Sequence, residues 1–379
     1  MKLLLAGIPI ALALFASQAQ AQASTPVYTW RNVSQALGVQ AENLQMNARG
    51  QLSGSVRYEG HHFAFLSNRD LTGIQRWPQL GASDSIAKAI NGAGQIAGTA
   101  KLGEYNWQAF ATEAGGEHPY LLAGARGEFN AAVGINEAGA VAGNRGYWGG
   151  QPNSATKWID HGQTVIELPS LGGASTLAAG INAAGQVVGE AQDQNGDLHA
   201  VLWSVSGREV QDLGTLGGRW STARALNDQG LVVGGSFTGD AVGFHAFAYD
   251  SASQQMRDLG TLGWGQSFAR AINNTGMVGG TLANGFISPS DPSLIGHAFI
   301  TGAHAQGMWD LNSFVHLQDG HYLADVLNIN DAGQILALDE QGAGYLLTPL
   351  PLPVPEPAAF SLLLAGLFAL RGVQRRRGH

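Results

Sequence analysis

The segment INAAGQVVGE, residues 181–190, occurs in seven versions along this chain. Clear copies are INGAGQIAGT from Ile90, INEAGAVAGN from Ile135, LNDQGLVVGG from Leu226 and INNTGMVGGT from Ile272; weaker copies are MNARGQLSGS from Met46 and INDAGQILAL from Ile329. Their asparagines are spaced by 44, 45, 46, 45, 46 and 57 residues and are Asn47, Asn91, Asn136, Asn182, Asn227, Asn273 and Asn330. Seven units of nearly one length indicate a repeat architecture.

Each copy of the segment predicts a tight turn between two strands. An Asn at the first position of a type I turn bonds back to the following backbone, and a Gly three residues later accepts the left-handed conformation. In the fifth unit the turn joins ARALN, residues 223–227, to LVVGG, residues 231–235, and HAFAY, residues 245–249, and DLGTL, residues 258–262, follow. We therefore expect four short strands per unit, connected as a meander.

Four-stranded repeats of about 45 residues are typical of β-propeller blades. A β-solenoid is the other architecture to consider, but its coils are usually shorter and do not need four turns per repeat. The repeats fill residues 27–350, and the chain carries 54 glycines with only 13% charged residues, as expected for an all-β fold with many turns. Strand-like VYTWRNV at residues 27–33 and GYLLTPL at residues 344–350 predict that the first and last units share strands and close a ring of seven blades.

The first 23 residues have the pattern of a secretory signal peptide. Lys2 precedes an apolar run over residues 3–15, which is too short to span a membrane, and small residues with Ala-x-Ala cleavage sites follow. We expect export through the Sec machinery. The chain contains no cysteine, which excludes a disulfide framework and thiol chemistry.

The last 26 residues, 354–379, form a tripartite tail, VPEPAAFSLLLAGLFALRGVQRRRGH. It has a Pro-Glu-Pro triplet, an apolar stretch over residues 358–370 and a basic end with four arginines. This tail closely resembles the PEP-CTERM sorting signal of Gram-negative bacteria. The resemblance implies recognition of Pro355, Glu356 and Pro357 by an exosortase-type membrane enzyme and transient anchoring in the inner membrane by a C-terminal transmembrane sorting helix. It further implies removal of the tail and delivery to the cell surface or extracellular matrix, commonly alongside exopolysaccharide production.

The repeats themselves also resemble a known family. The His-Ala-Phe strands, DLGTLGG from Asp212 and the INxxGxVVG segments are similar to the extracellular repeat family named for HAF, over most of residues 27–350. The third and seventh units lack the His, with SATKWI from Ser154 and GYLLTP from Gly344 in its place. Neither resemblance supplies an activity.

Histidines and acids that belong to the repeat are better explained by structure than by chemistry. Side chains at equivalent positions of separate blades point in equivalent directions around a ring, so they do not converge as metal ligands or catalytic bases must. The residues concerned are His199, His245 and His297, with His62 nearby, and Asp212, Asp258 and Asp310. DQNGDL, residues 193–198, has oxygens spaced as in calcium loops, but its Gly is misplaced and Ser204 stands where the closing Glu is required. We therefore predict a hairpin there, and neither a metal nor a cofactor.

Two further sets of residues are candidates for a site. Trp148, Trp220 and Trp264 lie in loop-like sequence and are the best candidates for ligand binding, because exposed tryptophans stack on sugar rings. Acids that depart from the repeat would serve glycoside chemistry if they converged in one cavity; these are Asp84, Glu104, Glu128, Asp291 and Asp325.

Charge and motifs narrow the function. Setting aside Lys2, Glu356 and the tail arginines leaves 15 basic and 27 acidic residues, a formal charge of −12 that disfavours nucleic acid as a partner. P-loop, nucleophile-elbow, zinc and dinucleotide motifs are absent from the sequence, and no catalytic residue is predicted. We expect a non-enzymatic, surface-sorted binding module for polysaccharide or another surface protein. The alternative is a carbohydrate-active hydrolase or lyase with acids in the propeller channel.

Overall fold

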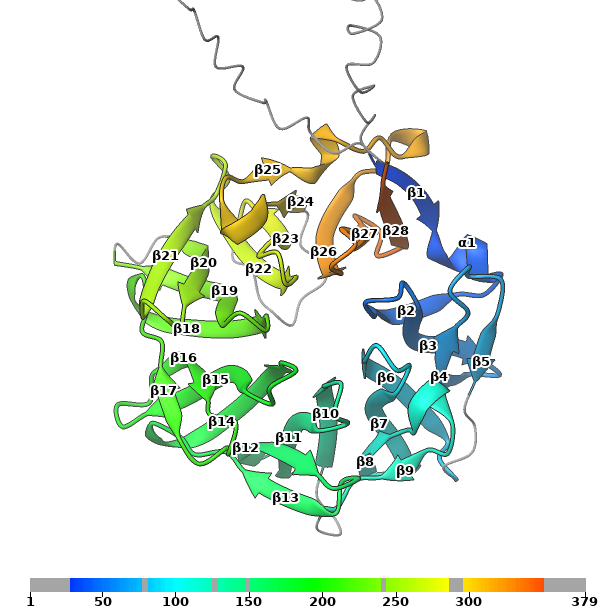
Figure 1. Ribbon diagram of the computed structural model, residues 1–379, viewed down its shortest axis with the longest axis horizontal. Helices are drawn as coiled ribbons and strands as arrows, with labels where there is room; N and C mark the ends of the chain where they lie inside the picture. Colours follow the sequence, from blue (N-terminus) through cyan, green and yellow to red (C-terminus); the bar gives the residue numbers. More distant parts are fainter. Residues whose placement is uncertain are drawn as a thin grey trace, which may run out of the picture. The chain divides into compact units, whose positions relative to one another are not determined.

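Seven four-stranded antiparallel sheets are arranged in a ring as the blades of a β-propeller (Figure 1). Residues of their inner strands line a central channel. The computed structural model describes residues 28–76, 81–124, 129–147, 150–239, 243–285 and 296–350. The ring confirms the all-β, seven-bladed prediction, and the solenoid alternative is wrong. The segments expected to act as signal peptide, residues 1–23, and as sorting signal, residues 354–379, lie outside the described residues.

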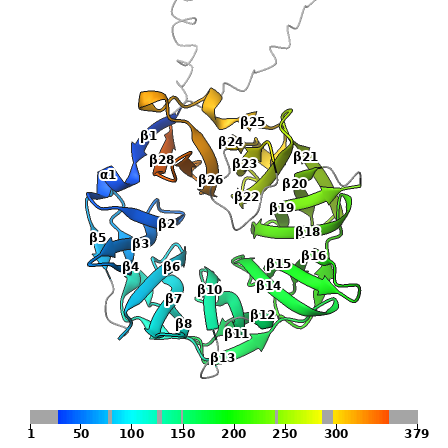
Figure 2. The ribbon, with the colours of Figure 1, turned by 180° about the vertical axis from the view of Figure 1, so that it is seen from behind.

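Six blades are each built from four consecutive strands, the first of which lies nearest the channel (Figures 1 and 2). Blade 1 contains β2 (Ala41–Met46), β3 (Leu52–Tyr58), β4 (His61–Ser67) and β5 (Ile74–Arg76); blade 2 contains β6 (Asp84–Ile90), β7 (Ile96–Gly103), β8 (Asn106–Ala111) and β9 (Tyr120–Leu121). Blade 3 contains β10 (Phe129–Ile135), β11 (Val141–Tyr147), β12 (Gly150–Ile159) and β13 (Thr164–Glu167); blade 4 contains β14 (Gly172–Ile181), β15 (Val187–Asp193), β16 (Leu198–Trp203) and β17 (Val210–Asp212). Blade 5 contains β18 (Gly217–Leu226), β19 (Leu231–Thr238), β20 (Phe244–Asp250) and β21 (Gln255–Gly260); blade 6 contains β22 (Gln266–Ile272), β23 (Val278–Ala283), β24 (Gly296–Ile300) and β25 (Trp309–Asp310).

Blade 7 combines strands from both ends of the repeat region. Its inner strands are β26 (Leu323–Ile329), β27 (Ile335–Asp339) and β28 (Gly344–Pro349), and its outer strand is β1 (Tyr28–Asn32). β1 pairs antiparallel with β28, with Tyr28 opposite Pro349. The expectation of shared strands is confirmed, and backbone hydrogen bonds between the first and last strands close the ring.

Helical segments are short and connect strands. Helix α1 (Val33–Leu37) follows β1; the Asn32 side chain caps it by accepting from the Gln35 backbone N–H at 3.0 Å. The 3-10 helices are η1 (Ala114–Gly116), η2 (Ala303–Ala305), η3 (Leu311–Ser313) and η4 (Gln318–Gly320). The last two lie in the connection between blades 6 and 7, which contributes to the longest spacing between repeat asparagines.

The core consists of apolar clusters between neighbouring sheets. The third strand of each of the first six blades supplies a fully buried aromatic side chain; these are Phe65, Phe110, Trp158, Trp203, Phe247 and Phe299. Burying one large apolar side chain is worth about 1.5–3 kcal/mol, so these strands anchor their blades.

The seven repeat asparagines form a closed ring of hydrogen bonds. Each donates from Nδ2 to the backbone carbonyl of the repeat asparagine in the next blade, over 2.9–3.5 Å, and Asn330 donates back to Asn47. The Gly three residues later has a positive φ and donates to the Asn carbonyl, as in Gly185 and Asn182, so the predicted turns are confirmed. The bond to the next blade was not expected from the sequence. One side chain therefore shapes its own hairpin and ties it to the neighbouring blade.

Candidate functional site

The innermost strand of most blades contains a β-bulge three residues before the repeat asparagine. Pairing with the second strand skips one residue at this point in blades 2 to 7. A bulge redirects the side chain of the extra residue. The skipped residues all line the central cavity of about 400 Å³, and they are Lys88, Val133, Ala179, Arg224, Arg270 and Leu327. We call these six the bulge residues.

A recurring glycine of the second strand makes room for the bulge. In blade 5, a Cβ on Gly234 would lie 1.9 Å from the Thr222 carbonyl oxygen of the inner strand. The same approach, at 1.9–2.1 Å, occurs at Gly98, Gly143, Gly189 and Gly280. No side chain fits at that distance, so the Gly of the VVG pattern is required by the bulge rather than by its own backbone conformation.

Three bulge residues are cations, and their surroundings differ. Lys88 Nζ donates to the neutral Asn43 Oδ1 at 2.7 Å. Arg270 Nε lies 2.7 Å from Asp325 Oδ2 on blade 7. Arg224 makes no hydrogen bond or ion pair with the described residues, and its Nε is buried without a partner. Burial lowers the pKa of Lys88 and of Arg224. The channel thus contains more positive charge than its lining neutralises.

Asp325 is the acid that faces this charge. Burial raises its pKa to about 6, although the Arg270 guanidinium and the Val326 backbone N–H act in the opposite direction. Desolvation of the carboxylate therefore outweighs its ion pair. Its Oδ1 has no hydrogen-bond partner among the described residues.

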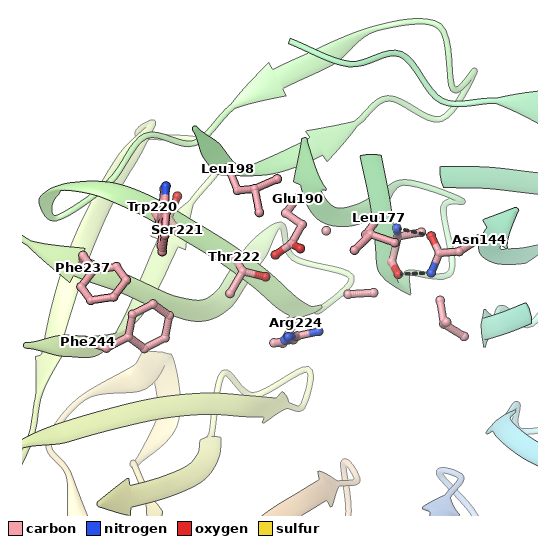
Figure 3. A pocket seen from close by; sticks show the side chains of 14 residues that line it. Asn144, Leu177, Glu190, Leu198, Trp220, Ser221, Thr222, Arg224, Phe237 and Phe244 are labelled. Carbon is pink, nitrogen blue, oxygen red and sulfur yellow. Dashed lines mark hydrogen bonds between the residues drawn. The ribbon is translucent and has the colours of Figure 1, made fainter. Parts of the chain in front are cut away.

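A pocket of about 610 Å³ opens between blades 4 and 5, at the edge where the inner strands begin (Figure 3). Trp220, Phe237 and Phe244 lie along one side of it, and Glu190 and Arg224 lie further in. Arg224 lines this pocket and the central cavity, as do Val133 and Ala179. The two hollows therefore adjoin at these residues, with the Arg224 guanidinium between them.

The aromatic side of the pocket is a chain of packed rings. Phe237 contacts Trp220 and Phe244 edge to face, with centroids 5.8 and 5.0 Å away, and Phe244 stacks on Phe268 at 5.7 Å. Phe244 and Phe268 are buried, whereas Trp220 is 49% exposed. The indole is therefore a fixed, accessible apolar surface, held from behind by the core of blades 5 and 6.

Polar groups complete the pocket. Asn144 donates to the Ala178 carbonyl at 3.1 Å and accepts from the Ala178 N–H at 2.7 Å, as the dashed lines in Figure 3 show. Its amide is thus used in bridging blades 3 and 4. The Glu190 carboxylate and the Thr222 hydroxyl face the pocket and make no hydrogen bond with the described residues, so they are available to a ligand.

The opposite mouth of the channel, beside the asparagine ring, is acidic. Asn274 Nδ2 donates to Asp228 Oδ2 at 3.1 Å and to Asp331 Oδ2 at 3.0 Å. Glu137 accepts from the Gly92 N–H at 2.6 Å in the same way that Asp228 accepts from Ala183. These acids extend the bonds between blades, and their oxygens have protein partners.

The repeat histidines and aspartates pair with each other. Nδ1 of His199, His245 and His297 lies 2.7–2.8 Å from Oδ2 of the aspartate thirteen residues later, Asp212, Asp258 and Asp310 respectively. In blades 4 and 5 the aspartate Oδ1 also accepts from a backbone N–H, that of Gly214 or Gly260. Each pair joins the third strand of a blade to the fourth, which agrees with the structural interpretation; the pairing itself was not foreseen.

The tryptophans proposed as ligand contacts have different environments. Trp220 lines the pocket, but it lies within strand β18 rather than in a loop. Trp264 lies in the turn before β22 and is half-buried, with its ring 4.7 Å from that of His297. Trp148 lies outside the described residues. Of the two described tryptophans, Trp220 lines this pocket and Trp264 does not.

The off-pattern acids that are described do not share one environment. Asp84 accepts from the His62 backbone N–H at 3.0 Å and lies beside the His61 ring. Glu104 is exposed in the turn after β7, and Asp325 faces Arg270. Glu128 and Asp291 lie outside the described residues. Sequence reasoning did not select Glu190 or Arg224, which are the charged residues of the pocket.

Two clusters of side chains carry the oxygen and nitrogen atoms that metal ligands need. DQNGDL forms the predicted hairpin between β15 and β16, with Asp193 Oδ1 accepting from the Asn195 and Asp197 N–H groups at 2.8 Å. In blade 7, ligand atoms of His321, Asp339 and Glu340 lie within 4.8 Å of one another. The histidine and both acids have protein hydrogen-bond partners, so this cluster is explained without an ion.

Within the described part of the chain, no helix has the length and apolar character needed to cross a bilayer. Neither a protein-family model nor a curated protein matches the sequence.

Several solved structures share the fold. Puromycin hydrolase superposes with a TM-score of 0.52 and 14% identity, over 83% of this chain and 54% of that chain. YCF48 from Cyanidioschyzon merolae gives 0.50 and 9%, over 84% and 98%. An oligogalacturonate lyase in complex with manganese gives 0.49 and 9%, over 86% and 94%. At these identities the similarity shows the β-propeller fold alone, and the proteins that share it include enzymes.

Proposed function

We propose that this protein is a non-enzymatic binding module of the cell surface or extracellular matrix, and that it holds polysaccharide in the pocket between blades 4 and 5. The observation that carries the proposal is the exposed Trp220 surface beside unpaired hydrogen-bonding groups, in a hollow of about 610 Å³. Sugars present apolar C–H faces and polar edges, so they need both kinds of group side by side.

The pocket is suited to binding because its walls are fixed before a ligand arrives. Phe237 and Phe244 pack behind Trp220, and the Asn144 amide fixes the backbone at Ala178. Fixed walls lower the entropic cost of binding, because few pocket side chains have to be ordered when the ligand arrives. The Glu190 carboxylate and the Thr222 hydroxyl then supply hydrogen bonds to sugar hydroxyls.

The lining favours binding over hydrolysis. Glycoside hydrolysis requires two carboxyl groups on either side of the scissile bond. Glu190 is the one carboxylate among the described residues that line the pocket, and Asp325 is held by Arg270. A hydrolase or lyase remains the alternative that the experiment must separate.

The experiment is a polysaccharide array probed with the purified protein, with retained protein and released reducing sugar recorded from the same wells. We expect retention without sugar release. Trp220→Ala should weaken retention about tenfold, since an aromatic contact contributes on the order of 1 kcal/mol beyond its buried area. Trp309→Ala, on β25 and 45% exposed, is the matched control and should bind as the wild type does. Sugar release would show that the protein is an enzyme and not a binding module. If neither retained protein nor released sugar is detected, a protein partner is favoured.

The proposal includes export through the Sec machinery and sorting through Pro355, Glu356 and Pro357. Glu356→Ala should leave the tail on the protein, so that cells accumulate a heavier, membrane-associated form. Glu104→Ala, which removes an exposed acid elsewhere, should be processed normally. Equal mature masses and equal release for both variants would contradict the sorting step and leave the binding site unaffected.

A further inference from the structure

The unpaired Arg224 guanidinium is the least satisfied charge in the described channel. It lies over the Phe268 ring, with Cζ 5.4 Å from the ring centroid, and its Nε is buried without a partner. The Glu190 charge acts on Arg224 without a hydrogen bond between them. A buried cation with no hydrogen-bonded counter-ion is costly, and native proteins retain such groups where something else completes them. The stability of the fold does not explain Arg224, because Ala179 occupies the same bulge position in blade 4.

A second guanidinium, that of Arg270, adds positive charge beside Arg224. Arg270 Cζ lies 5.3 Å from the centroid of the same Phe268 ring. Burial lowers the pKa of Arg224, the Glu190 charge raises it, and the positive charge of Arg270 lowers it further. Arg270 has Asp325 as its counter-ion, whereas Lys88, lining the same cavity, has only the amide oxygen of Asn43. Two of the three channel cations therefore lack an acidic partner within bonding distance among the described residues.

The position of Arg224 makes it accessible from the sugar pocket. It lines both the pocket, with Trp220, and the central cavity, with Arg270 and Lys88. In Figure 3 its guanidinium lies inward of Glu190 and Thr222. A ligand stacked on Trp220 would extend its next polar group towards Arg224.

Building on the proposed function, we propose that the polysaccharide is acidic and that the carboxylate of a uronic acid unit binds the Arg224 guanidinium at the channel entrance. The planar fork of an arginine matches a carboxylate through two parallel hydrogen bonds. One unpaired guanidinium matches one negative charge, and the nearby Glu190 carboxylate disfavours a dianion such as phosphate. Lys88 and Arg270 add an attractive field in a protein that is acidic elsewhere.

The test compares alginate, a polymer of uronic acids, with the same polymer after chemical reduction of its carboxyl groups. Binding of the purified protein is measured by affinity electrophoresis at a fixed salt concentration. We expect alginate to be retained at least about tenfold more strongly than its reduced form, and Arg224→Gln to abolish the difference. Arg224→Lys keeps the charge but loses the fork, and should lie between them. Arg208→Gln, at an exposed position of blade 4, removes the same charge and should bind alginate as the wild type does.

Each outcome has a defined meaning. Equal retention of both polymers, unchanged by Arg224→Gln, overturns the acidic-ligand inference while the proposed binding function stands. Failure of both polymers to bind, in a protein whose melting temperature is normal, overturns the acidic-ligand inference; the proposed function falls as well if the polysaccharide array also shows no retention. Competition by sodium sulfate as effective as by sodium glucuronate at equal ionic strength would assign the channel to inorganic anions and overturn the inference.

Discussion

The repeat asparagines and the bulge residues lie three positions apart in the same inner strands, yet the protein uses them in opposite ways. The asparagine is identical in all seven blades, and each amide is bonded within its own turn and to the next blade. The bulge position holds Lys, Val, Ala, Arg, Arg and Leu, and at Arg224 it has no partner. The constant position ties neighbouring blades together, whereas the variable position lines the central cavity.

The largest effect on the free energy of unfolding should come from substituting a repeat asparagine. Asn227→Ala removes the donor to the Asn273 carbonyl and the acceptor for the N–H groups of Gln229 and Leu231. We expect the free energy of unfolding to fall by about 3 kcal/mol, because several buried polar groups lose partners. Arg224→Ala, in the same strand, should change it by less than about 0.5 kcal/mol or raise it. Urea unfolding of both variants measures this difference, and equal losses would refute the division of roles.

The next effect concerns the support of the bulge. Gly234→Ala places a methyl group 1.9 Å from the Thr222 carbonyl oxygen, so the inner strand must move. We expect a loss of about 2 kcal/mol in the free energy of unfolding, since overpacking of this kind costs about 1–3 kcal/mol. Gly239→Ala, where the nearest atom would be 3.6 Å away, is the control and should be close to neutral. Thermal unfolding of the pair shows whether the bulge requires the glycine.

A third prediction concerns how the free energy of unfolding depends on pH through Asp325, the ion-pair partner of the bulge residue Arg270. The pKa of Asp325 is about 6 in the folded protein, above its ordinary value of 3.8, so the folded state takes up this proton first as the pH falls. Between about pH 6 and 4 the Asp325 contribution to the free energy of unfolding therefore rises as pH falls, by up to about 1.4 kcal/mol per pH unit. Asp325→Asn should lack this contribution. Subtracting the stability curves of the two proteins isolates it, and parallel curves would contradict the raised pKa.

The smallest effect should come from the histidine pairs, which repeat like the asparagines but lie near the surface. His245→Ser breaks the contact with Asp258 Oδ2 and introduces the residue that blade 3 has at Ser154. We expect a loss below about 1 kcal/mol, as for other polar side-chain pairs near the surface. Polysaccharide retention should not change, because His245 does not line the pocket. A larger loss would place the histidine among the residues that hold the ring.

The fold could be predicted from the sequence because each repeat carries the turn residues and strand patterns of one blade. Asn182 and Gly185 predicted the turns, and the strand-like sequences at residues 27–33 and 344–350 predicted the ring closure that β1 and β28 form. The pocket was not predictable in the same way. Trp220 was selected for its exposure, but its neighbours Phe237, Phe244 and Glu190 come from separate strands that only the packing of blades brings together.

The channel residues were missed for a different physical reason. A bulge inserts one residue into the strand, so the alternation of inward and outward side chains does not reveal where Arg224 points. A signal was nevertheless present in the sequence. Lys88, Arg224 and Arg270 each stand between two alanines, three residues before the repeat asparagine, which is an unusual place for a cation in an apolar strand.

The pairing of β1 with β28 also sets how the ring resists a pulling force. Tyr28 lies opposite Pro349, so the chain enters and leaves the ring at the same end of one antiparallel strand pair. A force applied between the two chain ends therefore acts across the strand pair rather than along it, and the inter-strand hydrogen bonds break one after another instead of sharing the load. Tension on the chain ends would therefore open the propeller at blade 7, first by separating β1 from β28 and then by breaking the bond from Asn330 to Asn47.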